Sequence, residues 1–381
     1  MTPSDSAGRF GQKPMNSSST SPPIRRCRGT NYQRGGMVLP PTSKHTFQLK
    51  VALRSPQPRS EVKKCLPSGS NIQKIASVES ISCGVRSMNA LDLIKLTSLM
   101  EISTGRPEVA IGLIDGPVAV NHPGLASENI REIPGMFSGA CSSTGSAACM
   151  HGTFVAGILS AKRDSQAPAI CPDCTLLIRP IFAETIPAHT QMPSATPDEL
   201  AEAITDCVNA GVRIINLSAA LTQPSAKGER ALEAALDSAL RRGVIVVVAA
   251  GNQGTVGSSA ITRHPWVIPV VSYDLQGRPL GHSNFGSSIG KGGLGAPGDA
   301  VTSLGAGGQT AISGGTSVAA PFVTGAIALL WSEFPETPAF QLKLAVASAS
   351  GQQRTTIVPP LLNAWAVYQA LEAAYRGKVA A

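Results

Sequence analysis

Five short apolar segments from Val109 onward constrain the fold more than any other feature of this chain. A strand that is apolar at successive positions is buried on both faces. Helical patterns separate the segments, and this alternation is typical of a parallel sheet covered on both sides. The sequence therefore predicts an α/β fold of three layers, with helices on either face of a central, mostly parallel sheet. The expected strands cover residues 109–114, 176–181, 212–217, 244–249 and 267–272.

Two of the intervening helices carry start or stop signals. Thr196-Pro197-Asp198-Glu199 combines an N-cap threonine, proline at the first helical position and the glutamate of a capping box. Gly211 is expected to end this helix, and Gly243 the helix over 228–242. The remaining expected elements are an amphipathic helix over 91–100, a helix over 151–162, a glycine-rich loop over 290–308 and a long buried helix over 317–334.

Residues 1–87 differ in composition from the rest of the chain. They are rich in Ser, Pro, Arg and Lys and show little periodicity, so they cannot bury enough apolar surface to offset their chain entropy. Three interpretations compete: a disordered basic tail, a cleaved pro-segment, or upstream sequence translated from a start placed too early. The inert tail and the early start are favoured over a folded inhibitory domain. We expect one folded domain over 88–375 and a short tail over 376–381.

The formal charge of +8 belongs to the first part of the chain. Residues 1–100 hold 15 Lys and Arg against 4 Asp and Glu, whereas the other 281 hold 17 against 20. A basic excess usually indicates an anionic partner, but here it lies in the tail, so we expect no nucleic-acid partner.

No apolar run reaches the roughly 18–20 residues that cross a bilayer, and no secretory signal pattern opens the sequence. We expect no membrane partner and a cytoplasmic location.

The cysteines favour reduced thiols. Eight in 381 residues is not the density of a disulfide scaffold. Cys171-x-x-Cys174 has the spacing of metal sites and redox pairs, and Cys141 and Cys149 could complete the four ligands of a zinc site, although nothing in their spacing requires it. For Cys171 and Cys174, a local disulfide or free thiols are favoured over zinc. We expect no metal and no cofactor.

Four polar residues stand at the ends of predicted elements. Asp115 follows the first strand, Asn252 follows Ala249-Ala250-Gly251, and His151 and Ser317 each open a helix. Ligands gather at the carboxyl ends of parallel strands. Singly, each residue is explained as a turn former or a helix cap. Together they supply a hydroxyl nucleophile, its base, a carboxylate to orient the base and an amide donor for an oxyanion.

Ser317 gains from its expected place at a helix N-terminus. Its own N–H can point at an oxyanion there, and the helix dipole favours negative charge. Pro321 is expected in the first turn of the same helix, where a missing N–H costs little. The small residues Gly314, Gly315, Ala319 and Ala320 leave space for a substrate backbone to approach.

The segments around these residues carry a family resemblance. Ile114–Gly116, His151–Gly157, Ala249–Asn252 and Gly315–Pro321 resemble the four signature blocks of subtilisin-like serine peptidases, in that family's order, and the resemblance spans roughly residues 108–345. It implies Asp115, His151 and Ser317 as a catalytic triad and Asn252 in the oxyanion hole. Ser283-Asn284-Phe285-Gly286 also resembles a turn of that family. The substrate-binding residues that the resemblance implies are Leu217, Ser218, Ala219, Ala250 and Gly251.

Within this class the chain resembles the proteases that mature ribosomal peptides of the cyanobactin type. The resemblance lies in Ile111–Pro117, Gly152–Arg163, Cys171–Cys174 and Val358–Trp365. It implies a peptide or precursor-peptide substrate, cleaved between leader and core. Related macrocyclases carry an extra insertion between the Asp and His blocks, and only 35 residues separate those blocks here. Hydrolysis is therefore favoured over transamidation, and a peptide-binding module that does not cut is the third alternative.

Overall fold

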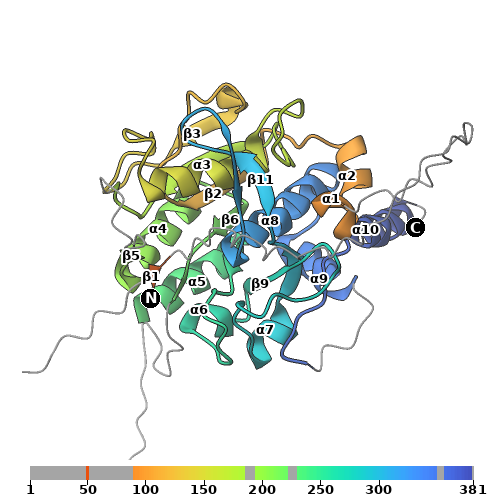
Figure 1. Cartoon of the computed structure of the whole chain (residues 1–381). Helices are drawn as coiled ribbons and strands as arrows, with labels where there is room; N and C mark the ends of the chain where they lie inside the picture. The colour runs from red at the N-terminus through yellow and green to blue at the C-terminus, as the bar shows by residue number, and fades with distance from the viewer. Residues whose placement is uncertain (1–48, 51–88, 185–193, 222–229, 350–355, 380–381) are drawn as a thin grey trace, which may run out of the picture. The chain divides into compact units, whose positions relative to one another are not determined.

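Seven parallel strands form the central sheet, in the order β10-β9-β8-β6-β2-β4-β3 (Figure 1). The computed structural model describes residues 49–50, 89–184, 194–221, 230–349 and 356–379. The predicted parallel sheet is confirmed. Its strands are β2 Ala110–Asp115, β3 Ile130–Glu132, β4 Thr175–Pro180, β6 Ile214–Leu217, β8 Ile245–Ala249, β9 Val267–Tyr273 and β10 Leu294–Pro297.

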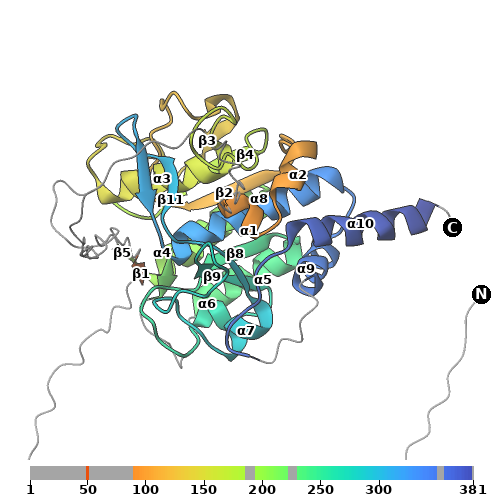
Figure 2. The same cartoon turned by 45° about the vertical axis from the view of Figure 1, so that its right-hand side comes forward.

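Two pairs of long helices cover the sheet. Helices α3, Ala147–Ser160, and α8, Thr316–Glu333, pack against each other and the sheet, and α4, Pro197–Asn209, pairs with α5, Arg230–Arg242 (Figures 1 and 2). Every residue of α8 except Glu333 is buried, as its apolar composition predicts. These pairs complete the three predicted layers. The shorter elements are α1 Ala90–Leu93, α2 Thr97–Ile102, η1 Ser127–Asn129, α6 Ala260–Arg263, α7 Ser287–Gly292, β11 Val301–Leu304, β12 Thr310–Ser313, α9 Ala339–Ser348 and α10 Ala364–Val379.

The start and stop signals of the helices act as expected. Thr196 Oγ1 accepts a hydrogen bond from the Glu199 N–H, and Glu199 accepts one from the Thr196 N–H, so the predicted capping box is present. Gly211 and Gly243 take φ values of +77° and +69° just past the ends of α4 and α5. These left-handed conformations favour glycine, which is why both helices end there.

Two other predictions about elements are wrong. The helix expected over 91–100 is broken into α1 and α2 at Lys95, whose φ is +55°. The loop expected over 290–308 contains β10, the edge strand of the main sheet, and β11. A Cβ at Gly295 would lie 2.3 Å from the Tyr273 ring, so the glycine that suggested a loop instead makes room for an aromatic neighbour.

A second, small sheet involves the N-terminal segment. β1, Leu49–Lys50, lies between β5, Ser194–Ala195, and β7, Ala220–Leu221, and runs antiparallel to both. Apart from these two residues, the segment 1–87 lies outside the described residues, so its three interpretations stay predictions.

The register of the central strands brings their carboxyl ends level. Ile114 of β2 pairs with Leu217 of β6, which pairs with Val248 of β8. The residues that follow, Asp115, Ser218 and the turn after Ala249, therefore meet at one edge of the sheet. This is the edge where an α/β sheet gathers its functional side chains.

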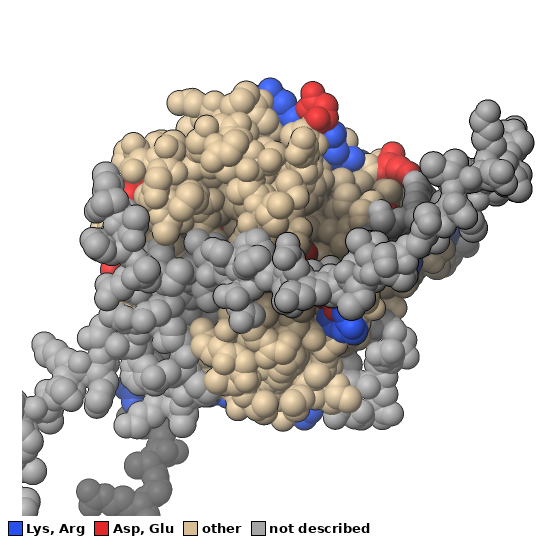
Figure 3. All heavy atoms as spheres, viewed as in Figure 1, with Lys and Arg blue, Asp and Glu red and all other residues tan. Residues whose placement is uncertain are grey.

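The surface carries few charges on the face seen in Figure 3. Lys, Arg, Asp and Glu side chains of the described residues are scattered there and do not gather in one patch. None of the helices in the described part of the chain has the length and apolarity needed to cross a membrane.

Candidate active site

Asp115, His151 and Ser317 form a continuous line of hydrogen bonds at the carboxyl edge of the sheet. Asp115 Oδ1 lies 2.7 Å from His151 Nδ1, and His151 Nε2 lies 3.1 Å from Ser317 Oγ. The exposed fractions of the three residues are 0 %, 2 % and 2 %. In this arrangement a carboxylate can hold an imidazole in one orientation, and the imidazole can accept the hydroxyl proton.

Two glycines allow the strand that carries Asp115 to approach the helix that carries His151. A Cβ at Gly116 would lie 2.1 Å from the Ala148 carbonyl oxygen, and a Cβ at Gly152 would lie 2.4 Å from the Gly116 carbonyl oxygen. Real Cβ atoms do not come so close to another atom, so glycine is required at both positions. The contact brings the end of β2 against the first two turns of α3.

The prediction that His151 opens its helix is wrong. Helix α3 begins at Ala147 after the N-cap Ser146, so His151 lies in its second turn. The residues between carry no helix breaker, and alanine is the best helix former. His151 is therefore held on both sides by helical backbone.

Asn252 is oriented by the first residue of α8. Its Oδ1 accepts a hydrogen bond from the Thr316 N–H at 2.9 Å, and Thr316 Oγ1 accepts one from the Gly251 N–H at 3.1 Å. Gly251 and Gly315 have φ values of +104° and +117°. The turn after β8 is thus joined to the helix that begins with Thr316. Thr316 received no role in the sequence analysis, although it lies inside a signature block.

Hydrogen bonds from the Asn284 side chain hold the turn that carries Asn252. Its Oδ1 accepts hydrogen bonds from the N–H groups of Gln253 and Thr255, both at 3.1 Å, and its Nδ2 donates to the Ala250 carbonyl at 3.2 Å. These contacts fall on both sides of Asn252. The motif Ser283–Gly286 was predicted only from its family resemblance, and the structure shows that Asn284 holds the turn after β8 in place.

The five predicted substrate-binding residues all line this edge. Leu217 and Ala219 are buried, with exposed fractions of 0 % and 1 %. Ser218 is also buried, and its hydroxyl donates to the Ser317 carbonyl at 3.0 Å. Ala250 and Gly251 belong to the turn after β8 that Asn284 holds. Their role toward a substrate stays a prediction.

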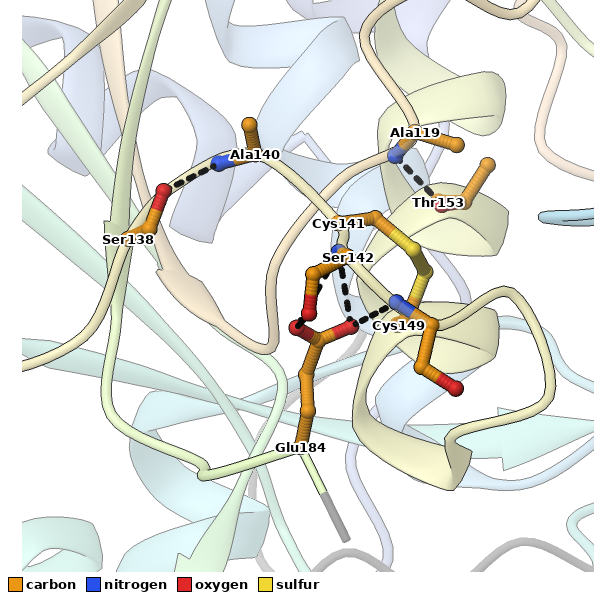
Figure 4. Close-up of a disulfide and its surroundings, with 9 residues drawn as sticks. Ala119, Ser138, Ala140, Cys141, Ser142, Cys149, Thr153 and Glu184 are labelled. Atoms are coloured by element: carbon orange, nitrogen blue, oxygen red, sulfur yellow. Dashed lines mark hydrogen bonds between the residues drawn. A yellow bond between two sulfur atoms is a disulfide. The ribbon is translucent and has the colours of Figure 1, made fainter. Parts of the chain in front are cut away.

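The expectation of reduced thiols is wrong for one pair. Cys141 and Cys149 are joined by a disulfide with a Cα–Cα distance of 5.6 Å (Figure 4), which lies within the ordinary range for this bond. Cys149 belongs to α3, two positions before His151, and Cys141 to the preceding loop. The two residues proposed to complete a zinc site with Cys171 and Cys174 are therefore bonded to each other.

Cys171 and Cys174 are buried free thiols, one of the two alternatives favoured for them. The hydrogen bond with Cys174 and burial both raise the pKa of the Cys171 thiol. The same hydrogen bond lowers the pKa of the Cys174 thiol, although burial opposes that shift. Cys207 is likewise free and buried, and burial raises its pKa.

Glu184 holds the loop that leads into α3. Its carboxylate accepts hydrogen bonds from the N–H groups of Ser142 and Ser143 and from the Ser142 hydroxyl (Figure 4). Partial burial acts to raise the pKa of Glu184, but these hydrogen bonds outweigh it and the net pKa is lowered. The disulfide and Glu184 thus fasten the same loop at adjacent points.

Comparison with known proteins identifies the family. A model described as the subtilase family matches residues 106–359. The chain belongs to the subtilase family. Mycosin-4 of Mycobacterium tuberculosis is 31 % identical over 276 residues, which cover 61 % of this chain and 59 % of that protein. The chain thus spans little more than half the length of this relative.

Two solved structures resemble the chain over most of their length. The patellamide maturation protease PatA is 30 % identical, with a TM-score of 0.61, and the match covers 71 % of this chain and 98 % of PatA. The prenylagaramide maturation protease PagA is 28 % identical, with a TM-score of 0.63, and covers 73 % and 98 %. The predicted subtilisin-like fold and the resemblance to cyanobactin maturation proteases are confirmed.

Removing the Glu184 carboxylate is expected to give a pH-dependent loss of stability. A carboxyl whose pKa is lowered by folding stabilises the fold above its ordinary pKa of about 4.3, and the contribution disappears as the pH falls through the lower folded value. Glu184→Gln should lower the free energy of unfolding at neutral pH. The difference from wild type should shrink as the pH falls below the ordinary pKa of glutamate and through the lower pKa of Glu184 in the folded protein. Urea unfolding at several pH values measures it. A difference that is constant with pH would contradict the interpretation.

Opening the disulfide is expected to destabilise the protein by about 2–3 kcal/mol, the chain-entropy value for a loop of this length. Its two cysteines are eight positions apart. Cys141→Ser and reduction of the wild type should lower the urea midpoint equally. The control is reductant added to Cys141→Ser, which should change nothing further. An equal effect of reductant on both proteins would place the sensitive cysteines elsewhere.

Proposed function

We propose that this protein is a serine endopeptidase that hydrolyses peptide bonds through an acyl-enzyme on Ser317. The line of hydrogen bonds from Asp115 through His151 to Ser317 carries the proposal. Membership of the subtilase family supports it independently. The preferred substrate is a ribosomally made precursor peptide, cut between leader and core.

The geometry supports one division of roles. His151 Nε2 takes the proton as Ser317 Oγ attacks the scissile carbonyl, and later delivers it to the leaving amine. Asp115 keeps the Nδ1–H side of the ring turned toward itself and stabilises the imidazolium that forms. Water then attacks the acyl-enzyme, with His151 again as the base, and releases Ser317.

The Asn252 amide is placed to stabilise the oxyanion. Because its Oδ1 is engaged by the Thr316 N–H, the orientation of the amide is set before a substrate binds. Ser317 lies in the first turn of α8, where backbone N–H groups have no partner within the helix. Donors that are fixed in advance need no reorganisation when charge develops on the carbonyl oxygen.

The small sheet supports binding of the substrate as an extended strand. β5 and β7 both pair with β1, one on each side, and β7 begins directly after Ser218-Ala219. β1 fills the space between β5 and β7, so an extended peptide that took the place of β1 could bind there through backbone hydrogen bonds. A substrate bound there would continue past Ser218 toward Ser317, with which Ser218 is in contact.

The precursor-peptide class rests on the likeness to the maturation proteases PatA and PagA, which are 30 % and 28 % identical to the chain. Hydrolysis is preferred to ring closure because the only helices and strands among the described residues between Asp115 and His151 are η1, β3 and the first turn of α3. Such short elements offer little to shield an acyl-enzyme from water.

Replacing the nucleophile should abolish turnover while leaving the fold intact. Ser317→Ala is expected to lower turnover by about 10⁴-fold or more. Mass spectrometry of wild type and variant with precursor-like and unstructured peptides measures this and locates the cleaved bond. Unfolding curves of the two proteins serve as the control. Linear fragments from the variant would refute the role of Ser317, cyclic products from the wild type would favour the transamidase, and no wild-type product would favour a binding module.

Asn252→Ala is expected to lower kcat by about 10²–10³-fold, the loss known for the equivalent amide of subtilisin, with a smaller effect on KM. Asn129→Ala is a matched control, because Asn129 is also half-buried but bonds only to the Pro172 carbonyl beside η1. It should leave kcat within about twofold. A loss of only a few-fold in Asn252→Ala would remove Asn252 from the oxyanion hole.

A further inference from the structure

Pro321 removes a hydrogen bond from the backbone of the proposed nucleophile. It is the sixth residue of α8, not part of the first turn as the sequence analysis expected. In an α-helix the N–H at position 321 would donate to the carbonyl of Ser317, and proline has no N–H. Ser317 is 2 % exposed, so water is largely excluded from this carbonyl. A buried carbonyl without a donor costs free energy, so its partner must come from elsewhere.

Ser218 supplies the missing donor. Its hydroxyl donates to the Ser317 carbonyl oxygen at 3.0 Å. Because that hydroxyl has only one proton, its oxygen is left to accept, and it accepts from Asn216 Nδ2 at 2.8 Å. Asn216 Oδ1 in turn accepts from the Thr324 hydroxyl at 2.9 Å. Ser218, Asn216 and Thr324 are all 0 % exposed.

This chain of hydrogen bonds attaches the end of β6 to two points on α8. Ser317 and Thr324 lie seven positions apart, two turns along the same face of the helix. In each of the three hydrogen bonds the donor and the acceptor are fixed, so the hydroxyl and amide groups of the network can be oriented in only one way. The backbone position of Ser317 is therefore set by the strand as well as by its own helix, and Ser317 Oγ stays 3.1 Å from His151 Nε2.

We propose that Ser218 is a positioning residue for the nucleophile: its hydroxyl replaces the helical hydrogen bond that Pro321 removes and so holds Ser317 against His151. This inference rests on the proposed function, and it assigns the Ser218 side chain a role different from substrate contact. Without the hydroxyl, the first turn of α8 must shift to find another donor for the Ser317 carbonyl. A displacement of a fraction of an ångström between nucleophile and base is enough to slow a reaction.

The test uses four forms of the full chain: wild type, Ser218→Ala, Pro321→Ala and the double variant. Each is treated with a small fluorophosphonate probe, and the second-order rate of labelling at Ser317 is followed by mass spectrometry. In that reaction Ser317 Oγ forms a bond to phosphorus, fluoride leaves and His151 takes the hydroxyl proton. The probe is too small to depend on the peptide groove, so labelling reports on the nucleophile. The kcat and KM on a cleaved peptide are measured in parallel.

Ser218→Ala is expected to slow labelling and lower kcat by about tenfold or more, with KM changed by less than about threefold. The double variant should recover to within about threefold of Pro321→Ala, because position 321 then has an N–H that can donate to the Ser317 carbonyl. A role in substrate contact would not be rescued in this way. Unfolding curves should show all four forms folded.

Ser332→Ala is the matched control. Ser332 is also a buried serine of α8, and its hydroxyl donates to the Ala328 carbonyl far from Ser317. This variant should be labelled at the wild-type rate to within about twofold, and a slower rate would show that labelling responds to helix packing in general.

Two results would overturn the inference about Ser218 without refuting the proposed function. One is normal labelling of Ser218→Ala with a raised KM, which would make Ser218 a substrate-binding residue. The other is a slow Ser218→Ala whose loss persists in the double variant. If Ser218→Ala does not fold, Thr324→Val breaks the far end of the network, and an unchanged labelling rate in that variant would overturn the inference. Absence of labelling at Ser317 in the wild type would instead refute the proposed function.

Discussion

The hydrogen bond between Asp115 and His151 is the contact on which the rest of the site depends. Both side chains are buried, and a buried carboxylate is tolerated only with a partner. Its formation requires the end of β2 to touch α3, which is possible because Gly116 and Gly152 have no Cβ. The disulfide and Glu184 then hold the loop that enters α3.

Ser317, the proposed nucleophile, is held by a different set of contacts. α8 is buried almost all round, so it is fixed by packing, but packing alone does not decide the orientation of its first turn. Three polar contacts do so: Thr316 with Asn252, Thr316 with Gly251, and Ser218 with the Ser317 carbonyl. Each joins the helix to the carboxyl end of β6 or β8. The sheet thus acts as the common frame for His151, Ser317 and Asn252.

Structural features that local sequence signals determine were predicted correctly. Capping residues, helix-ending glycines and apolar strands act within a few positions, so the elements they predict are present. Features that depend on contacts between distant parts of the chain were not predicted. β10 was expected to be part of a loop, but its glycine, Gly295, leaves room for the Tyr273 ring, and Cys141 bonds to Cys149 because a loop returns to α3. No sequence pattern indicates that Tyr273 packs against Gly295 or that Cys141 lies next to Cys149 in the folded chain.

The sequence by itself determined the fold class, the order of the signature blocks and the identities of Asp115, His151, Asn252 and Ser317, because residue types and short-range spacing suffice for these. Only the tertiary structure decided that His151 lies in a second turn, that Glu184 fastens the neighbouring loop, and that Ser218 bonds to the Ser317 carbonyl. These contacts join residues up to 99 positions apart. A hydrogen bond depends on distance and direction in space, and a linear sequence specifies neither until the chain has folded.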